Sequence, residues 1–213
     1  SKWRLKGHAE DKFWEWVASW AVMMQKPADL GYSQEGFELP KLTVHQITIP
    51  AKNIGDRLFA VEALSLQERQ RARKETIAER AAKCAEIVNA LDEPWLIWCN
   101  LNAESEALTK AIEGAVEIRG SHSPEYKEKA VTDFVDGRVK KIVSKPSITG
   151  FGLNFQHCCK QAFVGLSDSF EEYYQAVRRC WRFGQTKSVD VYIIITETEG
   201  AVAANIQRKE ADF

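Results

Sequence analysis

Two arginines three positions apart are the part of this sequence best suited to chemistry. Arg179 and Arg182 lie in the segment 175–185, whose other residues are largely apolar or aromatic. A spacing of three is close to one helical turn, so we expect both side chains on the same side of a helix. Two guanidinium groups on one side suit a polyphosphate. The alternative is a surface helix whose arginines pair with carboxylates.

The helix expected to carry these arginines has recognisable ends. One of Ser167, Asp168 and Ser169 can cap its start, and two glutamates follow in its first turn, where they favour the positive end of a helix. Gly184 is expected to stop it. The predicted helix therefore extends across both arginines.

An earlier segment, 144–156, places glycines and amides in an apolar context. Gly150 and Gly152 let the backbone approach a ligand or a neighbouring lobe without a Cβ in the way, or they only permit a tight turn between a strand and a helix. Asn154 and Gln156 are suited to hydrogen bonds across an interface, or to capping local backbone.

These segments resemble known motifs when they are taken together. Residues 175–185 resemble motif VI of superfamily 2 helicases and translocases, in the form used by the Swi/Snf-like group. The run Gly-Phe-Gly-Leu-Asn within 144–156 resembles motif V, and residues 95–100 lie where motif IV is expected. The resemblance covers roughly residues 40–200. It implies the C-terminal RecA-like lobe of an ATP-dependent DNA helicase or translocase.

The resemblance also implies roles for individual residues. Arg182 would be an arginine finger, which stabilises charge on the γ-phosphate of ATP bound to a separate N-terminal lobe. Arg179 would contact the same phosphate or couple the two lobes. Arg178 carries less weight and can pair with a local carboxylate instead. The other residues implied at the ATP and lobe interface are Gln175, Gly150, Gly152 and Asn154.

Contacts to the backbone of DNA are expected close to the motif V segment. Ser144 offers a hydroxyl and Lys145 a charge, as phosphate contacts require. Asn100, at the end of the motif IV segment, is a weaker candidate. Such contacts would follow the strand and read little sequence, and RNA in place of DNA stays open.

The sequence lacks the ATP-binding motifs of the N-terminal lobe of such a helicase or translocase. No G-x-x-x-x-G-K-[ST] loop occurs, and no acidic Mg²⁺-binding motif accompanies it. We therefore expect ATP and Mg²⁺ to be bound mainly by an N-terminal RecA-like lobe, and this chain alone to be inactive. Two alternatives stay open: a non-catalytic module that binds nucleic acid or protein, and the motor subunit of a restriction system.

Composition limits the class of protein. The 213 residues are 45% hydrophobic with a net charge of -1, which suits one substantial α/β domain with an appendage and gives no overall basic signature. No run reaches the length of a membrane span, and no secretory signal is visible. The five cysteines form no C-x-x-C pair and the four histidines are scattered, so we expect no metal site and a cytoplasmic protein with reduced thiols.

Strands and helices alternate along the chain, which predicts an α/β fold with a RecA-like parallel sheet and helices on both faces. Loops after the strands are expected to carry the functional residues, at the carboxyl ends of the strands. The predicted strands are 43–49, 95–99, 115–118, 141–144, 161–166 and 189–195. The predicted helices are 67–91, 103–112, 124–137 and 197–209.

Two helical segments carry further expectations. The helix 67–91 has an apolar face, whereas its basic residues, Arg80 and Lys83 among them, are expected on a solvated face or against DNA phosphates. Residues 1–41 are expected to form an aromatic-rich helical appendage and linker, packed on the sheet domain, and 42–213 the helicase C-terminal domain. The spacing of its aromatic residues predicts that they pack in a core. The resemblance instead places them in a connection between lobes, where an exposed aromatic patch is expected.

Overall fold

The computed structural model describes residues 7–21, 27–33, 38–50, 73–148, 154–167 and 169–196. The chain divides into two compact units, Ser1–Glu38 and Leu39–Phe213. The second unit contains the sheet and every residue predicted to act in catalysis or binding. The predicted helix 197–209 lies outside the described residues.

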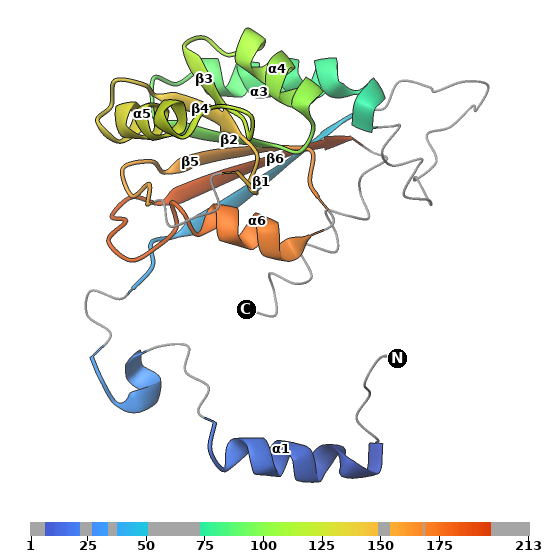
Figure 1. Ribbon diagram of the computed structural model, residues 1–213, viewed down its shortest axis with the longest axis vertical. Coiled ribbons are helices and arrows are strands. Elements are labelled where there is room, and N and C mark those ends of the chain that lie inside the picture. The colour runs from blue at the N-terminus through green and yellow to red at the C-terminus, as the bar shows by residue number, and fades with distance from the viewer. Residues whose placement is uncertain are drawn as a thin grey trace, which may run out of the picture. The chain divides into compact units, whose positions relative to one another are not determined.

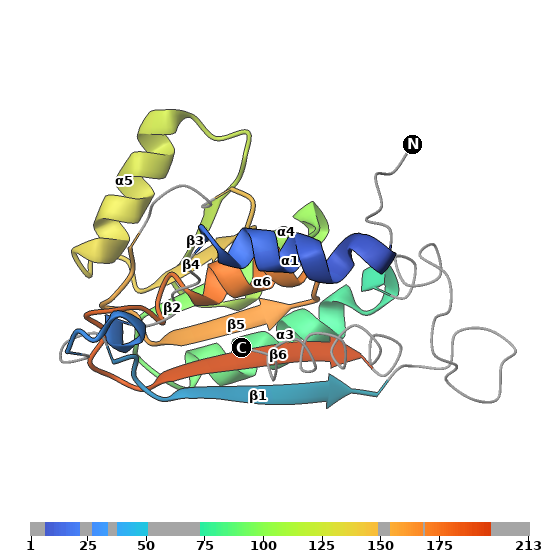
Figure 2. The same cartoon turned by 90° about the horizontal axis from the view of Figure 1, so that it is seen from below.

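A parallel sheet of six strands forms the centre of the second unit. Its order is β1-β6-β5-β2-β4-β3, and each neighbouring pair is parallel, as Figure 2 shows for β1, β5 and β6. The predicted RecA-like α/β fold is therefore confirmed. The strands are β1 (Leu42–Ile49), β2 (Trp95–Cys99), β3 (Ala115–Ile118), β4 (Lys141–Ser144), β5 (Lys160–Val164) and β6 (Val189–Thr196).

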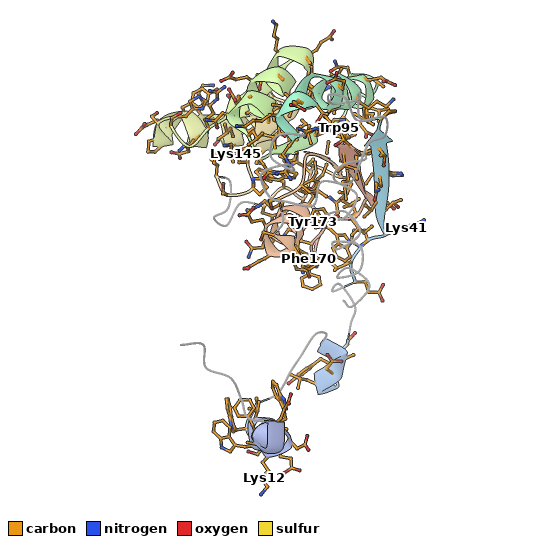
Figure 3. The ribbon with its side chains drawn as sticks, turned by 90° about the vertical axis from the view of Figure 1, so that its right-hand side faces the viewer. Lys12, Lys41, Trp95, Lys145, Phe170 and Tyr173 are labelled. Carbon is orange, nitrogen blue, oxygen red and sulfur yellow. The ribbon has the colours of Figure 1, made fainter. Side chains whose placement is uncertain are left out.

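Helices cover both faces of this sheet, so β2, β4, β5 and β6 are largely buried, whereas the edge strands β1 and β3 are mostly half-buried. α3 (Ile77–Asn89) and α4 (Asn102–Ala111) pack on one face, and α6 (Phe170–Val177) packs on the other (Figure 1). α5 (Pro124–Val135) shares the hydrophobic core of α6. Figure 3 shows Tyr173 of α6 directed into this core, where it is 3% exposed.

The central strand β2 illustrates how a continuous apolar run becomes a core strand. All five of its residues are buried. Trp98 donates its indole N–H to Oε1 of Gln161 on β5 at 2.8 Å, and Nε2 of Gln161 donates to the carbonyl of Val177 at 3.1 Å. A buried amide therefore ties two strands to the end of α6, and its polar atoms are paired as burial requires.

The structure of α3 differs in one respect from the prediction that its basic residues lie on a solvated face or against DNA phosphates. The apolar face of this helix is buried as predicted, through Ala81, Cys84 and Val88. Arg80, however, is fully buried and forms an ion pair with Glu104 of α4, so it does not belong to a solvated face. The pattern of α3 alone could not reveal this, because the partner carboxylate comes from another helix. Lys83 is partly exposed and pairs with Glu86.

Turn chemistry sets the ends of several elements. Ser123 caps α5 by accepting a hydrogen bond from the backbone N–H of Tyr126, and Pro124 occupies the first turn of this predicted helix. β5 ends at Val164 rather than Leu166 because Gly165 has a φ of 76°, outside the extended region.

The first unit contains α1 (Glu10–Ala18) and two short 3-10 turns among its described residues. Within this unit Trp14, Trp16 and Trp20 are exposed. The rings contact one another: Trp16 and Trp20 have centroids 5.3 Å apart. The described residues of the unit thus offer no second layer that would bury these rings, and packing on the sheet domain stays a prediction.

All five cysteines are buried and carry free thiols. Burial raises the pKa of the Cys99 thiol to about 12, so this thiol is protonated and unreactive near neutrality. Among the described residues, no helix has the length and apolar character needed to cross a membrane.

Candidate functional site

The segment with the paired arginines begins on α6 but is not itself helical. Ser169 caps the helix as predicted, because its hydroxyl accepts the N–H of Glu172 at 3.3 Å. The helix ends at Val177, however, and residues 178–184 form turns, so the expectation of a helix reaching Gly184 is wrong. The carbonyl of Arg179 accepts the N–H of Phe155 at 3.1 Å, which holds the turn segment against residues that end motif V.

Arg179 and Arg182 lie close together although no helix aligns them. Arg179 is 7% exposed, and Arg182 is half-buried. Burial lowers the pKa of Arg179, the neighbouring Cys180 opposes this, and the positive charge of Arg182 lowers it further. Arg179 still carries its charge near neutrality, since guanidinium groups stay protonated in proteins. Two cations held together in a partly buried place favour an anion between or beside them.

Arg182 is the clearer of the two candidate ligands. Its Nε is buried and has no hydrogen-bond partner within the part of the chain that the structure describes. It also forms no ion pair with a carboxylate among those residues. A buried donor without an acceptor is costly, and a phosphate oxygen would satisfy it.

A buried glutamine, Gln185, holds this turn segment in place, although the sequence analysis assigned it no role beyond the resemblance of its segment to motif VI. Nε2 of Gln185 donates to the carbonyls of Gln156 and Cys158 at 2.8 and 3.0 Å, and lies 3.4 Å from that of Cys180. Its Oε1 accepts the N–H of Lys187 at 3.0 Å. Gln156 in turn donates its side-chain amide to the carbonyl of Phe183, so it serves the local backbone.

Two neighbouring residues, Arg178 and Gln175, make local contacts that the sequence did not predict, and the interface role implied for Gln175 stays a prediction. Arg178 lies over the rings of Tyr174, Trp181 and Phe183, with its guanidinium carbon 5.4–6.0 Å from their centroids. It therefore contacts aromatic rings rather than the carboxylate suggested by the sequence. Gln175 is exposed, and Nε2 donates to Glu171 at 3.1 Å on the same helix.

This arginine segment lies at the amino edge of the sheet, which we define by the starts of β1, β5 and β6. The indole of Trp181 donates to the carbonyl of Pro40 at 2.7 Å, two positions before β1. Gln185 bonds to Cys158, just before β5. α6 runs back along the sheet and carries the segment to this edge (Figure 2). The expectation that all functional loops lie at the carboxyl ends is therefore wrong for this one.

The carboxyl edge, at the ends of β2, β4 and β5, holds the candidate nucleic-acid residues. Ser144 is buried, and its hydroxyl donates to the carbonyl of Ile118 at 3.0 Å. Nδ2 of Asn100 donates to the carbonyl of Gly165 at 2.9 Å. Lys145 follows β4 and is half-buried, with no ion pair among the described residues. Of the three, Lys145 is the best placed for a phosphate.

The structure gives few contacts for the remaining residues predicted at the ATP and lobe interface, Gly150, Gly152 and Asn154. Gly150 and Gly152 lie outside the described residues, and their roles stay predictions. Asn154 is exposed at the amino edge, directly before Phe155. An exposed amide can form a hydrogen bond to another lobe, and the interface role of Asn154 stays a prediction.

Comparisons with known proteins bear on the family and the fold of this chain. Residues 64–184 match the family described as the helicase conserved C-terminal domain. The chain is similar to the C-terminal part of the Fun30 ATPase domain, with a TM-score of 0.50 and 18% identity over 62% of this chain and 44% of that chain. It is also similar to the C-terminal domain of S. cerevisiae Dbp5 bound to Gle1 and IP6, with a TM-score of 0.54 and 13% identity over 64% of this chain and 81% of that one. At these identities the likeness concerns the fold. No curated protein matches the sequence.

Proposed function

Because this chain belongs to the helicase conserved C-terminal domain family, we propose that it is the C-terminal RecA-like lobe of an ATP-dependent DNA helicase or translocase of the Swi/Snf-like group. The observation that carries the proposal is the pair formed by Arg179 and Arg182, with a buried Nε of Arg182 that lacks an acceptor among the described residues. Such a group suits the γ-phosphate of ATP presented by a separate N-terminal lobe.

In this proposal the amino edge contributes electrostatics to phosphoryl transfer. As water attacks the γ-phosphorus and the bond from this phosphorus to the departing ADP oxygen weakens, Arg182 stabilises the charge on the γ-phosphoryl oxygens. Arg179 contacts the same phosphate or couples the lobes. Gln185 keeps the turn in place, so the guanidinium groups need little reorganisation. Mg²⁺, held mainly by the N-terminal lobe, would neutralise the β- and γ-phosphates when bound.

The carboxyl edge would meet the nucleic-acid backbone through Lys145, with Ser144 and Asn100 behind it. One stretch of chain joins the two edges, because the residues after Lys145 lead to Phe155, which bonds to Arg179. Closing and opening of the two lobes on ATP would then move the carboxyl edge along a strand. DNA is proposed over RNA because the run Gly-Phe-Gly-Leu-Asn and the pair Gly184-Gln185 resemble the forms of motifs V and VI in translocases of double-stranded DNA.

The proposal predicts that Arg182→Ala, in the longer protein with both lobes, lowers DNA-stimulated ATP turnover by roughly 10³-fold or more while nucleotide binding is largely kept. The matched control is Arg138→Ala, an exposed arginine paired with Asp133 and Asp136, which should leave turnover unchanged. Duplex DNA, single-stranded DNA and RNA are compared as stimulating ligands.

This chain alone serves as the blank. Unchanged turnover in Arg182→Ala would refute the arginine finger and favour a non-catalytic binding module. Turnover by the isolated chain would refute its dependence on a second lobe. Stimulation by RNA but not by DNA would reassign the substrate.

A further inference from the structure

A fully buried ion pair lies behind the carboxyl edge. Arg80 of α3 and Glu104 of α4 are both 0% exposed, with Nη2 and Oε1 2.8 Å apart. Nη1 of Arg80 has no hydrogen-bond partner within the described part of the chain. Removing two charges from water is costly, and apolar residues of similar volume often serve stability equally well. Stability alone is therefore a weak explanation for this pair.

The pair instead organises backbone. Oε2 of Glu104 accepts the N–H groups of Asn100 and Leu101, each at 2.9 Å, so it fixes the turn between β2 and α4. Nε of Arg80 donates to the hydroxyl of Thr76 at 3.2 Å, which holds the guanidinium group from the other side. A carboxylate with two backbone donors and one guanidinium partner has a single well-defined position.

A second loop is fixed against the same pair. At Gly165, a Cβ atom would lie 2.6 Å from Nη1 of Arg80 and 3.0 Å from Oε1 of Glu104, so only glycine lets this backbone pass. The carbonyl of Gly165 accepts Nδ2 of Asn100 at 2.9 Å. Arg73, whose own carbonyl accepts Nη2 of Arg80 at 2.5 Å, donates to the carbonyl of Leu166. The loops after β2 and β5 are thus joined through Arg80 and Glu104.

These loops flank the best-placed candidate for phosphate contact. Trp98 and Ser144 are register partners on β2 and β4, so Lys145 leaves the sheet beside the residues that lead to Asn100. Pro146, the next residue, lines a small crevice together with Asn100 and Gly165. A shift of either loop would therefore change the surroundings of Lys145.

We propose that Arg80 and Glu104 are positioning residues for nucleic-acid binding at the carboxyl edge. The pair holds the loops at Asn100 and Gly165 so that they and Lys145 form one preorganised surface for a phosphate backbone. This inference rests on the proposed function, because it takes the carboxyl edge to be where nucleic acid binds.

The test replaces both charges while keeping volume, with Arg80→Met and Glu104→Gln in one two-lobe protein. We expect the DNA concentration for half-maximal ATPase stimulation to rise by about tenfold, as when a catalytic or binding group is displaced by a remote change. Turnover at saturating DNA and KM for ATP should not change, since they are set at the amino edge. Hydrogen exchange should accelerate at residues 100–105 and 165–167 but not in β6.

A matched control removes an exposed pair from a helix that carries none of the candidate site residues. Lys129→Met with Asp133→Asn deletes an ion pair of 2.5 Å at the surface of α5, and it should change none of these values. The single variant Arg80→Met leaves the Glu104 carboxylate buried and unpaired, so it should unfold more easily than the double variant.

Each outcome decides a different claim. An unchanged DNA requirement in the folded double variant would overturn the positioning role. A fall in turnover and in thermal stability together with a rise in KM for ATP would also overturn it, since the pair would then be a general structural element. If the unsubstituted two-lobe protein is not stimulated by nucleic acid, the proposed function itself fails, and this inference fails with it.

Discussion

At the carboxyl edge two buried charges fix the loops, whereas at the amino edge a neutral amide does so. Arg80 and Glu104 use their charges on each other and on nearby backbone. Gln185 holds the turn segment through bonds to two backbone carbonyls and one backbone N–H. These bonds do not involve the charges of Arg179 and Arg182. Arg182, in contrast, forms no ion pair among the described residues.

The difference separates charges that give the fold its shape from charges that can bind a ligand. Charge that is already paired in the core contributes shape, because releasing it would leave a buried ion without a partner. Charge that is held in place by neutral neighbours stays available for a ligand that arrives and leaves, as a nucleotide must in each cycle. Arg182 is such a charge at the amino edge and Lys145 is one at the carboxyl edge, where Arg80 and Glu104 set only the shape of the surface.

Gly165→Ala should give the largest loss of stability, about 3 kcal/mol. Gly165 has a φ of 76°, and a Cβ there would overlap Arg80 and Glu104. Gly137→Ala is the matched control, because Gly137 has the same φ of 76° but open space around it. The control should cost only about 1 kcal/mol of conformational strain. Urea unfolding of this chain measures both, and equal losses would show that the buried pair does not restrict the loop.

The same edge shows where reading the sequence succeeds and where it stops. β2 and β6 were predictable because continuous apolar and β-branched runs leave few alternatives to a buried strand. The burial of Arg80 was not, since its partner Glu104 is distant in sequence and the basic residues around Arg80 suggest a solvated face. A buried charge becomes visible only when the fold has brought its partner to it.

The amino edge was predicted by residue type but not by geometry. The arginines at 179 and 182 stood out, yet the helix that was expected to align them ends at Val177. A spacing of three cannot distinguish a helix from a series of turns when a tertiary bond, here from Phe155 to the carbonyl of Arg179, replaces a helical one. The role of Gln185 was missed for the same reason, although its position at the end of a motif was a usable signal.

Gln185→Leu should cost about 2 kcal/mol of stability, because it leaves buried carbonyls without their donor. In the two-lobe protein, turnover at saturating DNA should fall by about tenfold as the turn loses its fixed position. The DNA concentration for half-maximal stimulation should not change, because the carboxyl edge is untouched. Steady-state kinetics with varied ATP and DNA separates these effects.

The exposed Gln175 provides the matched control for stability, since Gln175→Leu removes only a surface bond to Glu171. That variant should unfold within roughly 0.5 kcal/mol of the parent. A rise in the DNA requirement of Gln185→Leu, with turnover preserved, would contradict the assignment of separate tasks to the two edges.

The smallest effect should come from Arg178→Met, because Arg178 stacks on aromatic rings rather than facing a ligand. We expect a loss of about 1 kcal/mol in urea unfolding, since a cation over partly exposed rings contributes modestly and methionine retains part of the packing. Turnover should stay within about twofold of the parent, in contrast to Arg182→Ala, because Arg178 adds no charge to the phosphate in this arrangement. A collapse of turnover in Arg178→Met with the fold intact would mean that the stacked guanidinium swings toward ATP when the lobes close. The amino edge would then work with three arginines instead of two.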